Sequence, residues 1–201
     1  MNLRYLLLFD LVIVGVRMLV TGTPSYAFLV YNLFLAFIPF ALSTWAFRKE
    51  WKGASCWILF GLSWVWLFFL PNAPYLLTDF YHLKWKTEMS MLWYDIQMLF
   101  FYALTALFFF YKSLQQAEQL WLRFFKRGGG FFIGAVVFLC SYAIYLGRYL
   151  RFNTWDLILQ PWAVFQDMIL APQTLLFWQI VLPFFFFLLP SYFLFKNLHH
   201  K

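Results

Sequence analysis

The stretch that decides the interpretation of this chain is LPNAPYLLTDFYHL, residues 70–83. It ends a long apolar run and brings together two prolines, an amide, a carboxylate and an imidazole. Proline removes a backbone donor and restricts the residue before it, so Pro71 and Pro74 are expected to break the helix and turn the backbone. The segment therefore marks the end of one helical run and a candidate functional site.

A short helix is expected directly after this break, over residues 75–83. Asn72 is suited to cap its amino end, because an amide oxygen can accept a bond from an unpaired backbone N–H. Asp79 and His82 are three residues apart and would then share one face. Ionisable groups beside apolar segments are costly unless they are paired or used, so this face is the first place to look for function.

The composition of the whole chain indicates an integral membrane protein. Of its 201 residues 64% are hydrophobic and 11% charged, and the mean hydropathy is +0.72. A helix of about 20 apolar residues crosses the ~30 Å hydrocarbon core of a bilayer. The apolar runs are long enough for an all-α, polytopic fold in a single membrane domain, with a first helix that is retained. Six spans are expected, at about residues 4–20, 27–47, 55–70, 91–111, 131–150 and 173–195.

The positive charges orient these spans. The net charge is +7, but the basic residues lie in short loops, where they favour the cytoplasmic side and anionic lipid rather than nucleic acid. We therefore expect a multi-pass protein of the cell membrane with both termini in the cytoplasm and membrane lipids as partners. This topology places ten Lys and Arg residues inside (Arg4, Arg48, Lys49, Lys52, Lys112, Arg123, Lys126, Arg127, Lys196, Lys201) and four outside (Lys84, Lys86, Arg148, Arg151).

This topology also gathers polar residues at the extracytoplasmic ends of the third, fourth and fifth spans. They come from segments far apart in the chain, so a common cavity or pairing network can form only if the helix ends meet. Asp79 and Arg148 are expected to touch directly. The candidate site residues are Asn72, Tyr75, Asp79, His82, Asp95, Arg148, Arg151, Asn153 and Asp156.

Three groups of these residues resemble a known family. They are PNAPY (71–75) with Thr78-Asp79 and His82-Leu83, then WYD (93–95), then YLGR (145–148) with Arg151, Asn153 and Trp155-Asp156. Together they resemble the bacterial membrane family called domain of unknown function 1361, over most of the chain. The resemblance implies a bacterial multi-pass membrane protein and implies no activity.

The candidate residues allow three kinds of site. In the first, Arg148 and Arg151 neutralise carboxylates in buried pairs that only hold helices together. In the second, the same two arginines, three apart on one face, grip an anionic head, with Asp79 and His82 as catalytic base and acid. In the third, which is not favoured, a divalent metal ion is the cofactor. Its ligands would be Asp79, His82, Asp95 and Asp156.

These sites correspond to different functions, and whether the protein is an enzyme stays open. The leading hypothesis is binding or processing of an anionic envelope lipid or lipid-phosphate head; the alternatives are a non-catalytic structural or interaction protein and, more weakly, a small-solute or proton-coupled transporter. Phosphate-loop, zinc-protease and serine-hydrolase motifs are absent from the sequence. Within the spans, Asn32 is expected to hydrogen-bond another helix, and Asp10 to pair with Arg17 or another polar group or to relay protons.

Overall fold

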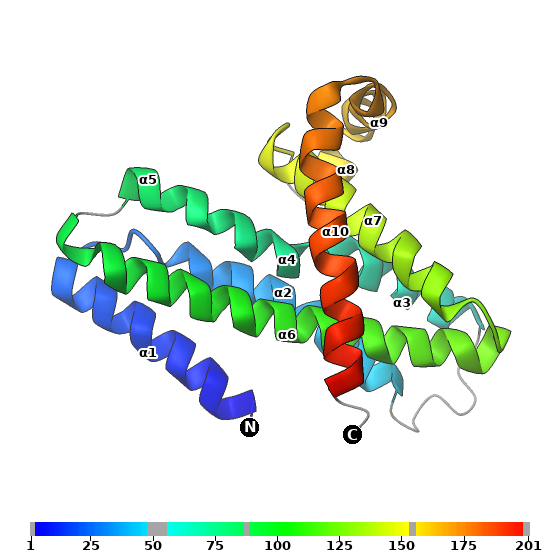
Figure 1. The fold of residues 1–201 in the computed structure, drawn as a ribbon, viewed down its shortest axis with the longest axis horizontal. Coiled ribbons are helices and arrows are strands. Elements are labelled where there is room, and N and C mark those ends of the chain that lie inside the picture. Colours follow the sequence, from blue (N-terminus) through cyan, green and yellow to red (C-terminus); the bar gives the residue numbers. More distant parts are fainter. Residues whose placement is uncertain (1–2, 48–55, 87–88, 153–155, 199–201) are drawn as a thin grey trace.

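The computed structural model describes residues 3–47, 56–86, 89–152 and 156–198, and every regular element in those residues is a helix (Figure 1). The main helices are α1 (Leu3–Thr21), α2 (Phe28–Phe47), α3 (Cys56–Phe69), α6 (Leu92–Phe125), α7 (Gly129–Arg148), α9 (Pro161–Leu170) and α10 (Leu175–Leu198). Shorter elements are α4 (Asn72–Tyr75), η2 (Leu76–His82), α5 (Leu83–Lys86), η3 (Met89–Met91), α8 (Asp156–Leu159) and η4 (Ala171–Gln173).

Within the described residues, five helical stretches are long and apolar enough to cross a membrane, which indicates a multi-pass membrane protein. They are Phe28–Ala46, Phe60–His82, Met89–Phe125, Gly129–Arg148 and Leu175–Leu198. The first expected span corresponds to α1, which contains Arg4, Asp10 and Arg17 and is not among the five. The sixth span and the cytoplasmic position of the termini stay predictions.

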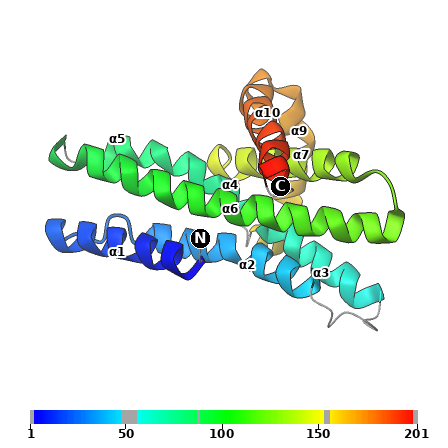
Figure 2. The same cartoon turned by 60° about the horizontal axis from the view of Figure 1, so that its bottom comes forward.

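Most of the helices lie along the long axis of the molecule, and α10 crosses α6 and α7 steeply (Figures 1 and 2). The centre of the core is the contact between α2 and α6, where Phe109 lies against Phe37 and Phe40 with ring centroids 5.5 and 5.2 Å away. Ala36 of α2 and Ala106 of α6 are both fully buried. Small residues at such an interface allow the helix backbones to approach closely.

The expected turn at Pro71 and Pro74 does not occur. Pro71 has helical angles, φ −62° and ψ −20°, and its carbonyl accepts the amide of Tyr75 at 3.1 Å. The chain continues through α4, η2 and α5 in the same general direction as α3 (Figure 1). Pro71 caps a new helix and Pro74 lies in its first turn, where backbone N–H groups need no helical partner, so the prolines divide the helix without reversing it.

Asn72 does not act as the expected amino-terminal cap. Its side-chain nitrogen donates to the carbonyl of Phe69 at 2.9 Å, so it satisfies a carbonyl at the end of α3. The capping position before α4 is Pro71, which makes no side-chain bond.

The fourth expected span, 91–111, is part of a much longer helix. α6 runs for 34 residues without interruption, which corresponds to about 51 Å. The polar residues expected in a loop are accommodated within the helix: Lys112 donates to Gln115 at 3.0 Å, and buried Glu118 bonds to Tyr192 and Lys196 of α10. The helix ends only at Lys126, in the left-handed region at φ 59°.

Candidate functional site

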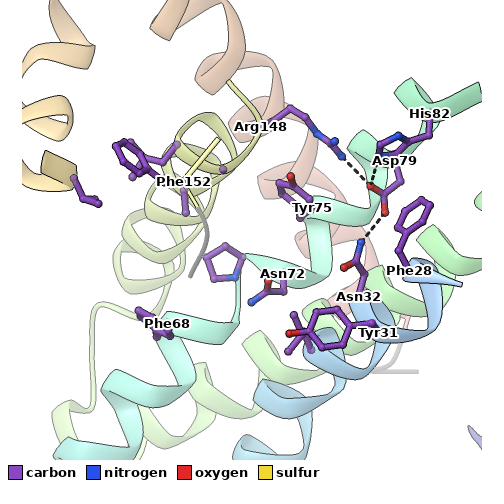
Figure 3. A pocket seen from close by; sticks show the side chains of 16 residues that line it. Phe28, Tyr31, Asn32, Phe68, Asn72, Tyr75, Asp79, His82, Arg148 and Phe152 are labelled. Atoms are coloured by element: carbon purple, nitrogen blue, oxygen red, sulfur yellow. Dashed lines mark hydrogen bonds and ion pairs between the residues drawn. The ribbon is translucent and has the colours of Figure 1, made fainter. Parts of the chain in front are cut away.

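A cavity of about 300 Å³ lies where α2, the α4–η2 segment and the carboxyl end of α7 meet (Figure 3). Three consecutive turns of α2 contribute Phe28, Tyr31, Asn32 and Leu35, whose spacing places them on one helix face. The remaining lining residues are Phe68, Pro71, Asn72, Tyr75, Asp79, His82, Ala143, Leu146, Gly147, Arg148, Phe152 and Val164.

Asp79 is a buried carboxylate in the wall of this cavity, with a side chain only 1% exposed. One carboxylate oxygen accepts a hydrogen bond from Arg148 at 2.8 Å, and the other accepts one from Asn32 at 3.2 Å. The Nε2 of His82 lies 3.8 Å from the oxygen that Arg148 holds. A carboxylate in this position joins α2, η2 and α7 through one residue (Figure 3).

Arg148 is held on three sides. Its Nε and one terminal nitrogen donate to the Thr78 hydroxyl, and the Thr78 hydroxyl donates to the carbonyl of Tyr75 at 2.6 Å. The guanidinium carbon lies 4.5 Å from the centre of the Tyr75 ring, a cation–π geometry. The side chain remains 26% exposed, so the arginine is fixed in place and still reachable from the cavity.

Gly147 permits this arrangement. A Cβ added there would meet the Tyr75 ring carbon Cε2 at 3.1 Å. The absence of a side chain therefore allows the last turn of α7 to approach the ring on which the next residue, Arg148, rests.

Five of the expected site residues line the cavity: Asn72, Tyr75, Asp79, His82 and Arg148. The expected contact between Asp79 and Arg148 is confirmed by the 2.8 Å ion pair. The expected interhelical bond of Asn32 is also confirmed, and its partner is Asp79. The roles of these residues in binding or catalysis stay predictions.

The sequence reasoning did not include Phe28, Tyr31, Asn32 or Thr78 among the site residues. Asn32 is an asparagine inside an apolar span, one turn after Phe28 and next to Tyr31, and this was the signal in the sequence that could have found the α2 side. His82 packs edge-to-face on Phe28, with centroids 4.9 Å apart, which fixes one side of the imidazole.

Asp95 was expected in this cluster and belongs to a different one. It is fully buried and binds Arg17 of α1, with Nε 2.6 Å from one carboxylate oxygen and Nη2 3.1 Å from the other. Because Arg17 binds Asp95, the pairing of Asp10 with Arg17, one of the alternatives expected for Asp10, is not formed. The physical reason is the register of α1 against α6, which places Arg17 opposite Asp95 and Asp10 near Tyr102.

The expected pair of arginines on one face is also not formed. α7 ends at Arg148, and Arg151 lies beyond it, exposed, with φ 61° in the left-handed region. Residues three apart share a face only within one helix, so Arg151 does not join Arg148. Asp156 begins α8 and does not line the cavity. Asn153 lies outside the described residues.

The four residues considered as metal ligands are not brought together. Asp79 and His82 line the cavity, whereas Asp95 and Asp156 do not. Among the residues that the structure describes, no three His, Cys, Asp or Glu side chains form a group that could hold a metal ion.

Comparison with known proteins gives one match. A family model described as "Protein of unknown function (DUF1361)" matches residues 31–190, which include every described residue of the cavity except Phe28. No curated protein and no solved structure matches the chain.

Proposed function

The chain belongs to the DUF1361 family of proteins of unknown function, and we propose that it binds an anionic amphiphile, with the head at Arg148 and the apolar tail in an adjoining groove. The observation that carries this proposal is that the polar cavity and an apolar cavity share a wall. An amphiphile such as an envelope lipid or a lipid phosphate has an anionic head joined to an apolar tail. The head would fit the polar cavity and the tail the apolar cavity beside it.

The apolar cavity has a volume of about 610 Å³ and lies between α3 and α7, with Met168 of α9 at its edge. Its lining is almost entirely apolar and includes Trp64, Leu139 and Tyr142. Four residues belong to both cavities: Phe68, Pro71, Ala143 and Leu146. The combined volume of the two cavities lies in the range of binding sites for small molecules.

Arg148 supplies the donor for the head. Two of its nitrogens bind Thr78 and Asp79, and in the described residues its Nη1 has no protein partner. Guanidinium groups bind phosphate and carboxylate through paired N–H donors. In the proposed site, Asp79 neutralises and positions the arginine, and the Nη1 donors would bind the head of the ligand.

Any proton transfer in this site would be carried out by His82 rather than by Asp79. Asp79 is 1% exposed and already holds Arg148 and Asn32, whereas the His82 side chain is 28% exposed and lines the cavity. A general acid or base must reach the proton it moves. Processing of the bound head would therefore use His82 as acid or base and Asp79 as the group that orients it.

A purely structural function is the second candidate. The specific observation that favours it is the position of Asp79, which binds groups from two other elements and leaves neither carboxylate oxygen without a partner. Such a network would hold α2, η2 and α7 together whether or not a ligand binds.

The test compares two Ala→Leu variants on α7. Ala143→Leu fills the junction of the two cavities, and Ala135→Leu makes the same change at an exposed position outside both. Each protein is placed in phosphatidylcholine nanodiscs, and binding of dioctanoyl phosphatidic acid or dioctanoyl phosphatidylcholine is measured by native mass spectrometry. We expect preferential binding of the phosphatidic acid, weakened about tenfold by Ala143→Leu, a change of ~1.4 kcal/mol.

Ala135→Leu should bind the phosphatidic acid as the unchanged protein does. Equal binding of both lipids, unaffected by Ala143→Leu, would refute the amphiphile site and favour the structural function. Elemental analysis of the same preparations would test the metal hypothesis separately.

A further inference from the structure

A second buried acidic group lies outside the amphiphile site, on the contact between α1 and α6. Asp10 of α1 is fully buried, and Tyr102 of α6 donates its hydroxyl to the Asp10 backbone carbonyl at 2.8 Å. Arg17 and Asp95 form their ion pair farther along the same two antiparallel helices. The contact therefore contains two buried carboxylates and one buried guanidinium.

The two carboxylates are in opposite situations. Asp95 accepts two bonds from Arg17, at 2.6 and 3.1 Å. In the described residues, neither carboxylate oxygen of Asp10 has a hydrogen-bond partner, and the same holds for the hydroxyl of Thr105, which is 2% exposed and lies next to this carboxyl.

The other charged and titratable groups on α1 and on residues 92–110 of α6 are exposed or have partners. On α1, Arg4 is exposed and Arg17 binds Asp95. On α6, Tyr94 and Tyr102 donate to backbone carbonyls of α1. A buried carboxylate without a cation is strongly disfavoured, and binding a proton removes the charge.

We propose that Asp10 is a proton-binding site, with its carboxyl in the neutral form and hydrogen-bonded to the hydroxyl of Thr105. A neutral carboxyl has one O–H donor and one carbonyl acceptor, and a hydroxyl can both accept and donate. One bound proton therefore provides partners for the two carboxyl oxygens of Asp10 and for the hydroxyl oxygen of Thr105. The proton is taken from a hydronium ion of the solvent: its O–H bond breaks as the carboxyl O–H bond forms, and a water molecule is left.

This site explains how α1 can lie in an apolar environment with three charged residues. The proton neutralises Asp10, and Asp95 neutralises Arg17, which leaves only the exposed Arg4 near the amino end. The site is independent of the amphiphile proposal, because Asp10 and Thr105 do not line either cavity.

Infrared spectroscopy of the full chain in nanodiscs tests the proposal, because a protonated carboxyl has a C=O band that a carboxylate lacks. We expect one such band near neutral pH that is lost in Asp10→Asn and retained in Asp95→Asn. In Thr105→Val the band should remain and shift, since its hydrogen-bond partner is removed; this variant provides the assignment if Asp10→Asn does not fold.

Two results would overturn the proposal. The first is the absence of any band that depends on Asp10 or Thr105 near neutral pH, which would show an ionised carboxylate. The second is a band present in choline chloride that disappears in sodium chloride, which would show that the site takes a sodium ion in place of the proton.

Discussion

Asp79 and Arg148 contribute to stability unequally. The Asp79 carboxylate is buried at 1% exposure, whereas the Arg148 side chain is 26% exposed and rests on Tyr75. Loss of the arginine leaves a buried carboxylate without its cation, and loss of the carboxylate leaves a cation that can still reach the cavity. The two residues form one pair, yet replacing each has a different cost.

Arg148→Met should lower the free energy of unfolding by about 3 kcal/mol, the low end of the range for a broken buried pair, because one partner is partly exposed. Asp79→Asn should cost less, and the double variant should recover part of the loss. Denaturant titration in detergent micelles measures all three. Arg127→Met is the control, since Arg127 is an exposed arginine in the turn before α7 and its removal should change little.

The glycine beside Arg148 offers a second test at this scale. Gly147→Ala brings a Cβ within 3.1 Å of the Tyr75 ring, so the ring must shift away from the guanidinium. We expect a loss of about 1–2 kcal/mol and weaker binding of phosphatidic acid. Gly134→Ala is the matched control on α7, because an added Cβ there meets nothing within 4 Å. Equal thermal unfolding midpoints for the two variants would show that the close approach at Gly147 has no energetic importance.

The element that organises the helices is α6. It contacts α2 along the core, binds α1 through Asp95 and binds α10 through Glu118, whose carboxylate lies 2.6 Å from Lys196. Its 34 residues, about 51 Å, exceed the ~30 Å of hydrocarbon, so one length of helix connects groups at several membrane depths. The ion pair from Arg17 to Asp95 and hydrogen bonds from Tyr94 and Tyr102 to backbone carbonyls of α1 attach α1 to this helix.

Replacing Arg17 should therefore loosen α1 from α6. Arg17→Met leaves the fully buried Asp95 without its cation, and the expected cost is about 3–5 kcal/mol, more than for Arg148→Met because both partners are buried. Limited proteolysis of the chain in nanodiscs should show faster cleavage before residue 28. Arg4→Met removes an exposed arginine of the same helix, and cleavage as fast as in Arg17→Met would contradict the role assigned to the ion pair.

At the scale of the whole molecule, the two ends of α6 mark opposite ends of the long axis (Figure 1). The η3 segment precedes α6 at one end, and the turn before α7 follows it at the other. The expected topology places the first end outside the cell and the second in the cytoplasm, in agreement with the excess of basic residues in the cytoplasmic segments.

Cysteine labelling tests this topology. Ser90→Cys and Arg127→Cys are each introduced after Cys56 and Cys140 have been replaced by serine. A membrane-impermeant maleimide added to intact cells should modify the cysteine at 90 and should reach the one at 127 only after the membrane is opened. Modification of both from the same side would remove the six-span topology.

The sequence by itself determined the helical membrane class, because apolar runs of about 20 residues leave few other folds. It also determined much of the cavity: the polar cluster at residues 71–82 and the arginine that ends α7 both line it. Five expected site residues meet there, and the contact between Asp79 and Arg148 is present. These features depend on local composition and on which helix ends lie on the same side.

The tertiary structure alone decided the partners of the other charges. Arg17 binds Asp95 across 78 residues, and Arg151 lies beyond the end of α7 rather than beside Arg148. It also decided that the chain stays helical through Pro71 and Pro74. Such outcomes depend on the register of one helix against another and on the residue at which a helix ends. A shift of one residue turns a helical side chain by about 100°, so the partner of a buried charge is set by packing over the whole interface.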